Sequence, residues 1–96
     1  MKNSHNIYLV SDSTGETLDR IFLALKAQFK NFDYRINQFS FIRTETQIKK
    51  IIENAYRSKN SIILYTIVNS KLAKFLTEES SKKKIACFGV LGELIL

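Results

Sequence analysis

Five consecutive residues have side chains suited to binding an anion: Ser11, Asp12, Ser13, Thr14 and Gly15. They follow a short apolar run at 7–10 and precede a helical pattern of apolar residues that begins at Leu18. Hydroxyl groups donate hydrogen bonds to phosphate oxygens. The first N–H groups of a following helix, with the positive end of its dipole, point at the same turn. The stretch therefore predicts a strand-to-helix turn that can hold a phosphate or a carboxylate.

The same residues also allow purely structural interpretations. Ser13-x-x-Glu16 has the spacing of a capping box, in which each side chain bonds to the other residue's backbone N–H. A Glu16 held in this way would repel an anion, so capping and binding remain alternatives. Asp12 is either a general base or the holder of a metal-bound water, or it closes a local turn with its own backbone. Neither the spacing of a dinucleotide fingerprint nor that of a Walker A loop is present.

The composition of the 96 residues is that of a folded protein. Hydrophobic residues make up 45% of the sequence, and proline is absent. This length predicts one α/β domain over residues 1–96. The single cysteine, Cys87, leaves no internal disulfide, so we expect a cytoplasmic setting. We expect no metal site, since no Cys/His cluster occurs, and no membrane association, since no apolar run reaches the length of a membrane span.

The formal net charge of +6 raises the question of acidic partners. The basic residues stand mostly at helical positions, for example Lys49, Lys50, Arg57, Lys71 and Lys74. No nucleic-acid recognition motif accompanies them. Solvated helix surfaces explain the charge better than nucleic-acid binding, and we therefore expect no nucleic-acid partner.

Strands and helices alternate along the chain. Apolar runs predict strands at 7–10, 34–42, 62–68 and 85–88. Apolar residues at three- and four-residue spacing predict helices at about 14–30, at about 44–58 and from 69 or 70 to about 84. The β-α-β-α-β-α-β order predicts a three-layer α/β fold, with a mainly parallel four-stranded sheet in the order 2-1-3-4 and helices on both faces. The weakly patterned second strand should lie at an edge.

In this order the first and third strands flank the point where the strand order reverses. Ligands of such sheets bind beyond the carboxyl ends of the strands at that point. The residues 11–15 and 66–70 should therefore come together. Thr66 and Asn69 are weaker binding candidates, because Asn69 is better explained as a helix cap.

Three segments resemble one family of regulatory enzymes. Residues 7–17, residues 65–69 with Leu72, and residues 87–92 are similar to the N-terminal part of the pyruvate, phosphate dikinase regulatory proteins and the phosphoenolpyruvate synthase regulatory proteins. This resemblance implies a cytoplasmic, bifunctional serine/threonine kinase and phosphorylase. Such enzymes phosphorylate a threonine of the dikinase with ADP, and they remove that phosphate with inorganic phosphate. The partner implied is the dikinase, or the synthase.

The chain departs from this family in one respect. Members are longer, and their nucleotide-binding P-loop lies in a C-terminal domain that has no counterpart here. The only glycines are Gly15, Gly89 and Gly92, and none has the spacing or the following lysine of a P-loop. We therefore assign no catalytic residue, and we expect neither ADP nor phosphate to bind strongly to this chain alone. A separate C-terminal half and a homodimer are further partners to consider. The alternative function is a non-catalytic anion-binding or protein-docking module.

Overall fold

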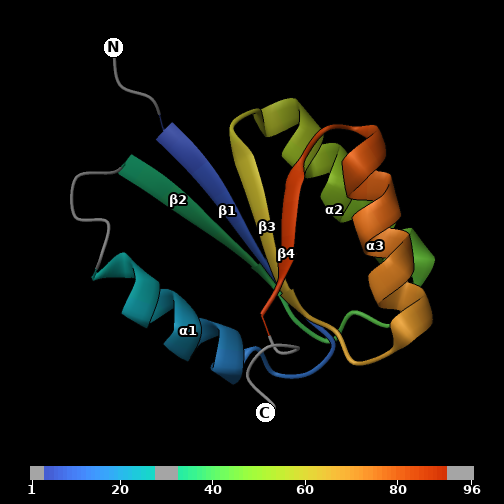
Figure 1. Ribbon diagram of the computed structural model, residues 1–96, viewed down its shortest axis with the longest axis horizontal. Coiled ribbons are helices and arrows are strands. Elements are labelled where there is room, and N and C mark those ends of the chain that lie inside the picture. Colours follow the sequence, from blue (N-terminus) through green and yellow to red (C-terminus); the bar gives the residue numbers. More distant parts are fainter. Residues whose placement is uncertain (1–3, 28–32, 91–96) are drawn as a thin grey trace.

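The computed structural model describes residues 4–27 and 33–90, and within them it shows an α/β fold (Figure 1). The elements in chain order are β1 (Ser4–Ser11), α1 (Glu16–Lys26), β2 (Asp33–Phe39), α2 (Glu45–Ser58), β3 (Ser61–Thr66), α3 (Ser70–Lys82) and β4 (Ala86–Gly89). The predicted alternation of strands and helices is confirmed.

The four described strands form one sheet in the order β2-β1-β3-β4, and all three pairings are parallel. This is the predicted order, with β2 at an edge. β1 pairs with both β2 and β3, and Ser11 at its end lies opposite Thr66. Figure 1 shows α2 and α3 on one side of the sheet and α1 on the other, which confirms the three-layer arrangement.

The two faces of the sheet carry separate apolar clusters, because neighbouring residues of a strand point to opposite faces. Tyr8 and Val10 of β1 pack with Ile63 and with residues of α2 and α3. Leu9 packs instead with Leu18 and Phe22 of α1, and partly buried residues of the strands adjoin that cluster. The larger cluster thus lies under α2 and α3, while α1 is the helix on the other face in the described part of the chain.

Several predicted ends of elements are wrong. β1 begins at Ser4 rather than at Ile7, and β3 ends at Thr66 rather than at Val68. β2 ends at Phe39 rather than at Ile42, because the residues after Phe39 bond to the loop that follows β1. α1 begins at Glu16, two residues later than predicted. Its predicted last turn falls partly on residues 28–32, which lie outside the described part of the chain. None of the helices described in residues 4–27 and 33–90 is long and apolar enough to cross a membrane.

Candidate functional site

Of the five predicted binding residues, Ser11 is the last residue of β1 and the other four follow it at the carboxyl edge of the sheet. Ser11 is only 1% exposed, and Gly15 is also buried. Ser13 and Thr14 are exposed, and Asp12 is half-buried. The loop therefore presents two hydroxyl groups to solvent and keeps the residues on either side of them inside.

Ser11 shapes the loop from within. Its Oγ accepts a hydrogen bond from the backbone N–H of Ser13 at 3.0 Å and lies 3.3 Å from the Ser13 Oγ. A buried hydroxyl with partners inside its own loop stabilises the loop and is not available to a ligand, because those contacts use its hydrogen-bonding capacity. Of the two serines, Ser13 is the one that a ligand in solvent can reach.

Asp12 connects this loop to the loop that follows β3. Its Oδ2 accepts a hydrogen bond from the backbone N–H of Val68 at 2.8 Å, and its own N–H donates to the Thr66 carbonyl at 3.4 Å. The carboxylate reaches across to the neighbouring loop instead of closing a local turn. The predicted meeting of residues 11–15 with residues 66–70 is confirmed by these contacts.

The start of α1 depends on Gly15. This residue has a φ of 85°, in the left-handed region that favours glycine. A Cβ at this position would lie 2.9 Å from the Gln38 Nε2. The Gly15 carbonyl accepts the first helical hydrogen bond, from the Asp19 N–H at 3.0 Å. Glycine thus occupies the N-cap position, although it has no side chain with which to cap the helix.

The predicted capping box between Ser13 and Glu16 is wrong. The Glu16 N–H donates to the Thr14 Oγ1 at 3.4 Å, while the Ser13 hydroxyl lies against Ser11. By contrast, Thr44 and Gln47, which have the same spacing, form a complete capping box at the start of α2. The N-terminus of α1 is therefore less completely capped than that of α2.

The cap of α3 follows the prediction. The Asn69 Oδ1 accepts a hydrogen bond from the Leu72 N–H at 3.0 Å. Asn69 therefore stabilises the first turn of α3, and its carboxamide oxygen is committed to that role. Thr66, the other weaker candidate, is buried.

A second loop, between β2 and α2, lies along the first. The N–H groups of Phe41 and Ile42 donate to the carbonyls of Ser13 and Ser11, each at 3.0 Å. The Ser40 hydroxyl donates to the Thr14 carbonyl at 3.1 Å. Phe41 has a φ of 57°, which is rare for a residue with a side chain. Its ring is 54% exposed.

Arg43 is the functional candidate that the sequence reasoning missed. Its Nη1 donates to the Asp12 carbonyl, and the residue is exposed. A guanidinium group bonded to the backbone of the loop that carries two exposed hydroxyl residues supplies the positive charge that an anion site needs. The signal that identifies it is its position: Arg43 stands between a strand and a helix cap, which in a parallel sheet places it at the carboxyl edge.

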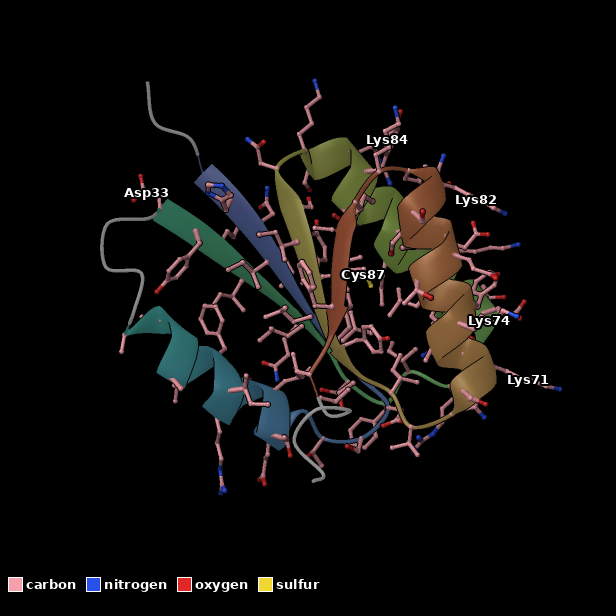
Figure 2. All side chains as sticks on the ribbon, in the orientation of Figure 1. Asp33, Lys71, Lys74, Lys82, Lys84 and Cys87 are labelled. Atoms are coloured by element: carbon pink, nitrogen blue, oxygen red, sulfur yellow. The ribbon has the colours of Figure 1, made fainter. Side chains whose placement is uncertain are left out.

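The charges around the edge are mixed. The helices α1, α2 and α3 all begin at the carboxyl edge of the sheet, so the positive ends of their dipoles point toward that edge. Glu16 and Glu45 stand in the first turns of α1 and α2. Figure 2 shows that the side chains of Lys71, Lys74 and Lys82 point away from the sheet. These lysines are exposed, as the interpretation of solvated helix surfaces predicts.

The carboxyl edge thus combines exposed hydroxyl residues, a guanidinium group and the incompletely capped N-terminus of α1. These groups lie at the point of the parallel sheet where the strand order reverses. Such an arrangement is typical of doubly wound α/β proteins, which bind their ligands at this place. The chain belongs to the kinase/pyrophosphorylase family, because the sequence model of that family matches residues 7–96.

Relatives with curated names are similar over almost the whole chain. A protein of Pelagibacter ubique is 58% identical over 96 residues, which are 100% of this chain and 35% of that protein. A protein of Alkaliphilus oremlandii is 45% identical over 89 residues, covering 93% of this chain and 32% of its own length. A protein of Syntrophomonas wolfei is 40% identical over 92 residues, which are 96% of this chain and 33% of that protein. All three are named pyruvate, phosphate dikinase regulatory proteins, and the chain spans about a third of their length.

Proposed function

We propose that this chain supplies the N-terminal part of a bifunctional regulator of pyruvate, phosphate dikinase. The observation that carries the proposal is the 58% identity, over all 96 residues, to the relative from Pelagibacter ubique. The name of that relative points to the dikinase as the target, with phosphoenolpyruvate synthase as the alternative target in related proteins. The protein would act in the cytoplasm, where these metabolic enzymes work.

The proposed activities are two opposed phosphoryl transfers. In the first, a threonine hydroxyl of the dikinase attacks the β-phosphorus of ADP, so that the threonine gains the phosphoryl group and AMP leaves. In the second, inorganic phosphate attacks the phosphothreonine, which frees the hydroxyl and forms pyrophosphate. Both reactions need positive groups around the transferred phosphoryl group, whose oxygens carry the charge.

In this scheme the carboxyl edge holds a phosphate. The Ser13 and Thr14 hydroxyls donate to its oxygens, and Arg43 neutralises its charge. The N-terminus of α1 adds its dipole, and Gly15 at its N-cap has no side chain of its own in front of the helix start. Ser11 and Asp12 hold the loop in shape from the protein side.

The nucleotide requires the remaining two thirds of such a protein. The three glycines of this chain do not form a P-loop, and a P-loop needs backbone amides that wrap the phosphates. We therefore expect this chain alone to be inactive, and to bind ADP and phosphate only weakly. A C-terminal part, in the same polypeptide or in a separate one, supplies the donor site.

A reconstitution assay tests the proposal. This chain is mixed with the separately produced C-terminal part of the Pelagibacter ubique relative, with ADP labelled in its β-phosphate, and with phosphohistidine dikinase. We expect label on a dikinase threonine only when both parts are present. The full-length relative is the positive control. If it labels the dikinase and the two parts together never do, the proposal is wrong.

A second candidate function is that of a non-catalytic anion-binding or protein-docking module. The exposed hydroxyl loop without a P-loop favours it. An NMR titration of the chain with phosphate, ADP and the dikinase distinguishes the candidates. Binding by residues 11–15 together with inactivity in the reconstitution assay would favour the module. Unchanged spectra with all three would remove the loop as a site of either function.

A further inference from the structure

On the side of α1, the described residues cover β3 and β4 only in part. Ile62 lies opposite Ala86, and Leu64 lies opposite Phe88, so these four side chains share one face of β3 and β4. Leu64 also lies opposite Leu9, which packs against α1. The four residues Ile62, Leu64, Ala86 and Phe88, here called the β3–β4 strip, thus lie on the same side as α1.

The strip is more exposed than the opposite face of the same strands. Phe88 is 56% exposed, Ala86 is exposed, and Ile62 and Leu64 are half-buried. On the other face Ile63 is fully buried. Figure 2 shows Cys87 pointing from β4 toward α3, which covers that face. The described residues provide no such cover for Phe88, since α1 packs on β1 and β3.

The geometry points to a docking place for the polypeptide that follows in the longer relatives, and we propose that an amphipathic helix from that part packs on the β3–β4 strip. Parallel sheets are covered on both faces. The relatives have about two thirds of their length beyond the part that this chain matches. This inference rests on their length and not on the proposed activity.

The path of the chain beyond β4 supports this occupant. The Val90 N–H donates to the Tyr65 carbonyl at 3.0 Å, which continues the ladder of β4. The Val90 side chain packs against the cluster of Leu9, Leu18 and Phe22. The last described residue, Val90, therefore lies on the side of α1, next to the strip.

A second copy of the chain suits the strip less well. A stable dimer buries about 800 Å² on each partner, which is more than four side chains on two short strands offer. Each copy also has a net charge of +6, which opposes association. A single helix needs only a narrow apolar surface.

Hydroxyl-radical footprinting on two proteins tests the inference. One is this chain alone, and the other is this chain joined to the part of the Pelagibacter ubique relative that lies beyond the matched region. Phe88 and Tyr56 form a matched pair of aromatic residues, because they are 56% and 55% exposed and belong to different elements. We expect Phe88 to react at least about threefold more slowly in the joined protein, as a half-exposed ring does when it is buried. Tyr56 should react equally in both.

Equal reactivity of Phe88 in the two proteins would overturn the inference. So would protection of Phe88 that grows with the concentration of the chain alone, because a second copy would then occupy the strip. Phe88→Asp provides an independent measurement. It should lower the thermal midpoint of the joined protein more than that of the chain alone, whereas Tyr56→Asp should lower both equally. Equal losses for Phe88→Asp would contradict the proposal.

Discussion

Among individual side chains, Arg43 is placed best to hold an anion at the carboxyl edge, because its guanidinium group lies against the loop of Ser13 and Thr14. Arg43→Ala should weaken phosphate binding about tenfold, the size expected for one exposed charge-assisted hydrogen bond. NMR titration with inorganic phosphate measures the change. Arg43→Lys should restore only part of the affinity, since lysine lacks the planar fork of donors.

Arg57→Ala is the matched control for this experiment. Arg57 is also exposed, but it stands in the last turn of α2, at the opposite end of that helix from Arg43. Its loss should leave phosphate binding unchanged. An equal weakening in both variants would mean that the net charge of the chain attracts the phosphate, and that Arg43 has no special role.

Gly15 gives a prediction about stability. Gly15→Ala should lower the free energy of unfolding by about 1–2 kcal/mol, because alanine is strained at a φ of 85°. The new Cβ also meets the Gln38 side chain. Urea denaturation measures the loss. In a Gln38→Ala background the same change should cost less, since the Gln38 contact is gone and only the backbone strain and a contact with the Ser40 Oγ at 3.3 Å remain. A Gly15→Ala variant as stable as the wild type would contradict the conformation described.

At the level of single residues, the sequence predicts part of the candidate site. The hydroxyls, the carboxylate and the glycine of residues 11–15 are local signals, and they lie at the predicted edge. The role of Arg43 and the left-handed Phe41 are not predicted, because both depend on hydrogen bonds between residues about thirty positions apart. No periodicity within a short window encodes such contacts. The same tertiary contacts explain why Ser13 turns to Ser11 and does not cap α1.

Of the helices, α2 has a complete cap whose strength can be measured. Thr44 Oγ1 accepts from the Gln47 N–H at 3.2 Å, and the Gln47 side chain bonds back to the Thr44 N–H at 3.0 Å. Thr44→Ala should cost about 1 kcal/mol of unfolding free energy, the usual value of an N-cap. Urea denaturation followed by circular dichroism provides the measurement.

Thr46→Ala, in the first turn of the same helix, is the control. Thr46 is exposed, and alanine is a better helix former than threonine, so this variant should be as stable as the wild type or slightly more stable. A similar loss in both variants would show that the first turn tolerates no change and that the cap is not the cause.

The existence and type of the elements follow from the sequence, but their ends do not. β2 illustrates the reason. The apolar residues Phe41 and Ile42 continue the strand pattern, so the sequence extends the strand to Ile42. In the structure both residues donate their N–H groups to the loop after β1 instead. A tertiary hydrogen bond has prevailed over local propensity, which is the usual source of error at strand ends.

For the molecule as a whole, the partly buried Cys87 thiol and Tyr65 phenol predict how stability depends on pH. Burial raises the pKa of the Cys87 thiol above its usual 9.0, an effect that the Ser80 hydroxyl partly opposes. Burial, with the nearby Cys87 charge, raises the pKa of Tyr65 above 10.0. The unfolded chain therefore loses these protons at lower pH than the folded one. This contribution to stability is complete below the unfolded pKa and is lost as the pH rises through the folded pKa.

The free energy of unfolding should thus stay level from about pH 7 to pH 8 and fall above about pH 9. Cys87→Ala should reduce that fall, even if its stability at pH 7 is lower. Urea titrations at each pH give the free energy of unfolding. The slope of this free energy against pH, and not its absolute value, is compared between the variant and the wild type. An identical fall in the variant would contradict a raised pKa at Cys87. Alkylation of the wild-type thiol at pH 8 should also be slow until urea unfolds the chain.

The topology is the property that the sequence predicts best. Continuous apolar strands that alternate with amphipathic helices leave few right-handed arrangements, and the weak pattern of β2 selects the edge for it. The uneven cover of the two faces is not predicted. Leu64 and Phe88 are as apolar as Ile63, and only the positions of the helices show that their face lacks a complete cover.

The central place of β1 has a consequence for synthesis on the ribosome. β1 emerges before both strands that pair with it, β2 on one edge and β3 on the other. The nascent chain has to keep Tyr8, Leu9 and Val10 from other partners until residue 66 has left the tunnel. These are among the most deeply buried residues of the finished fold. These three residues are thus a segment that a nascent-chain chaperone would bind before β3 is available.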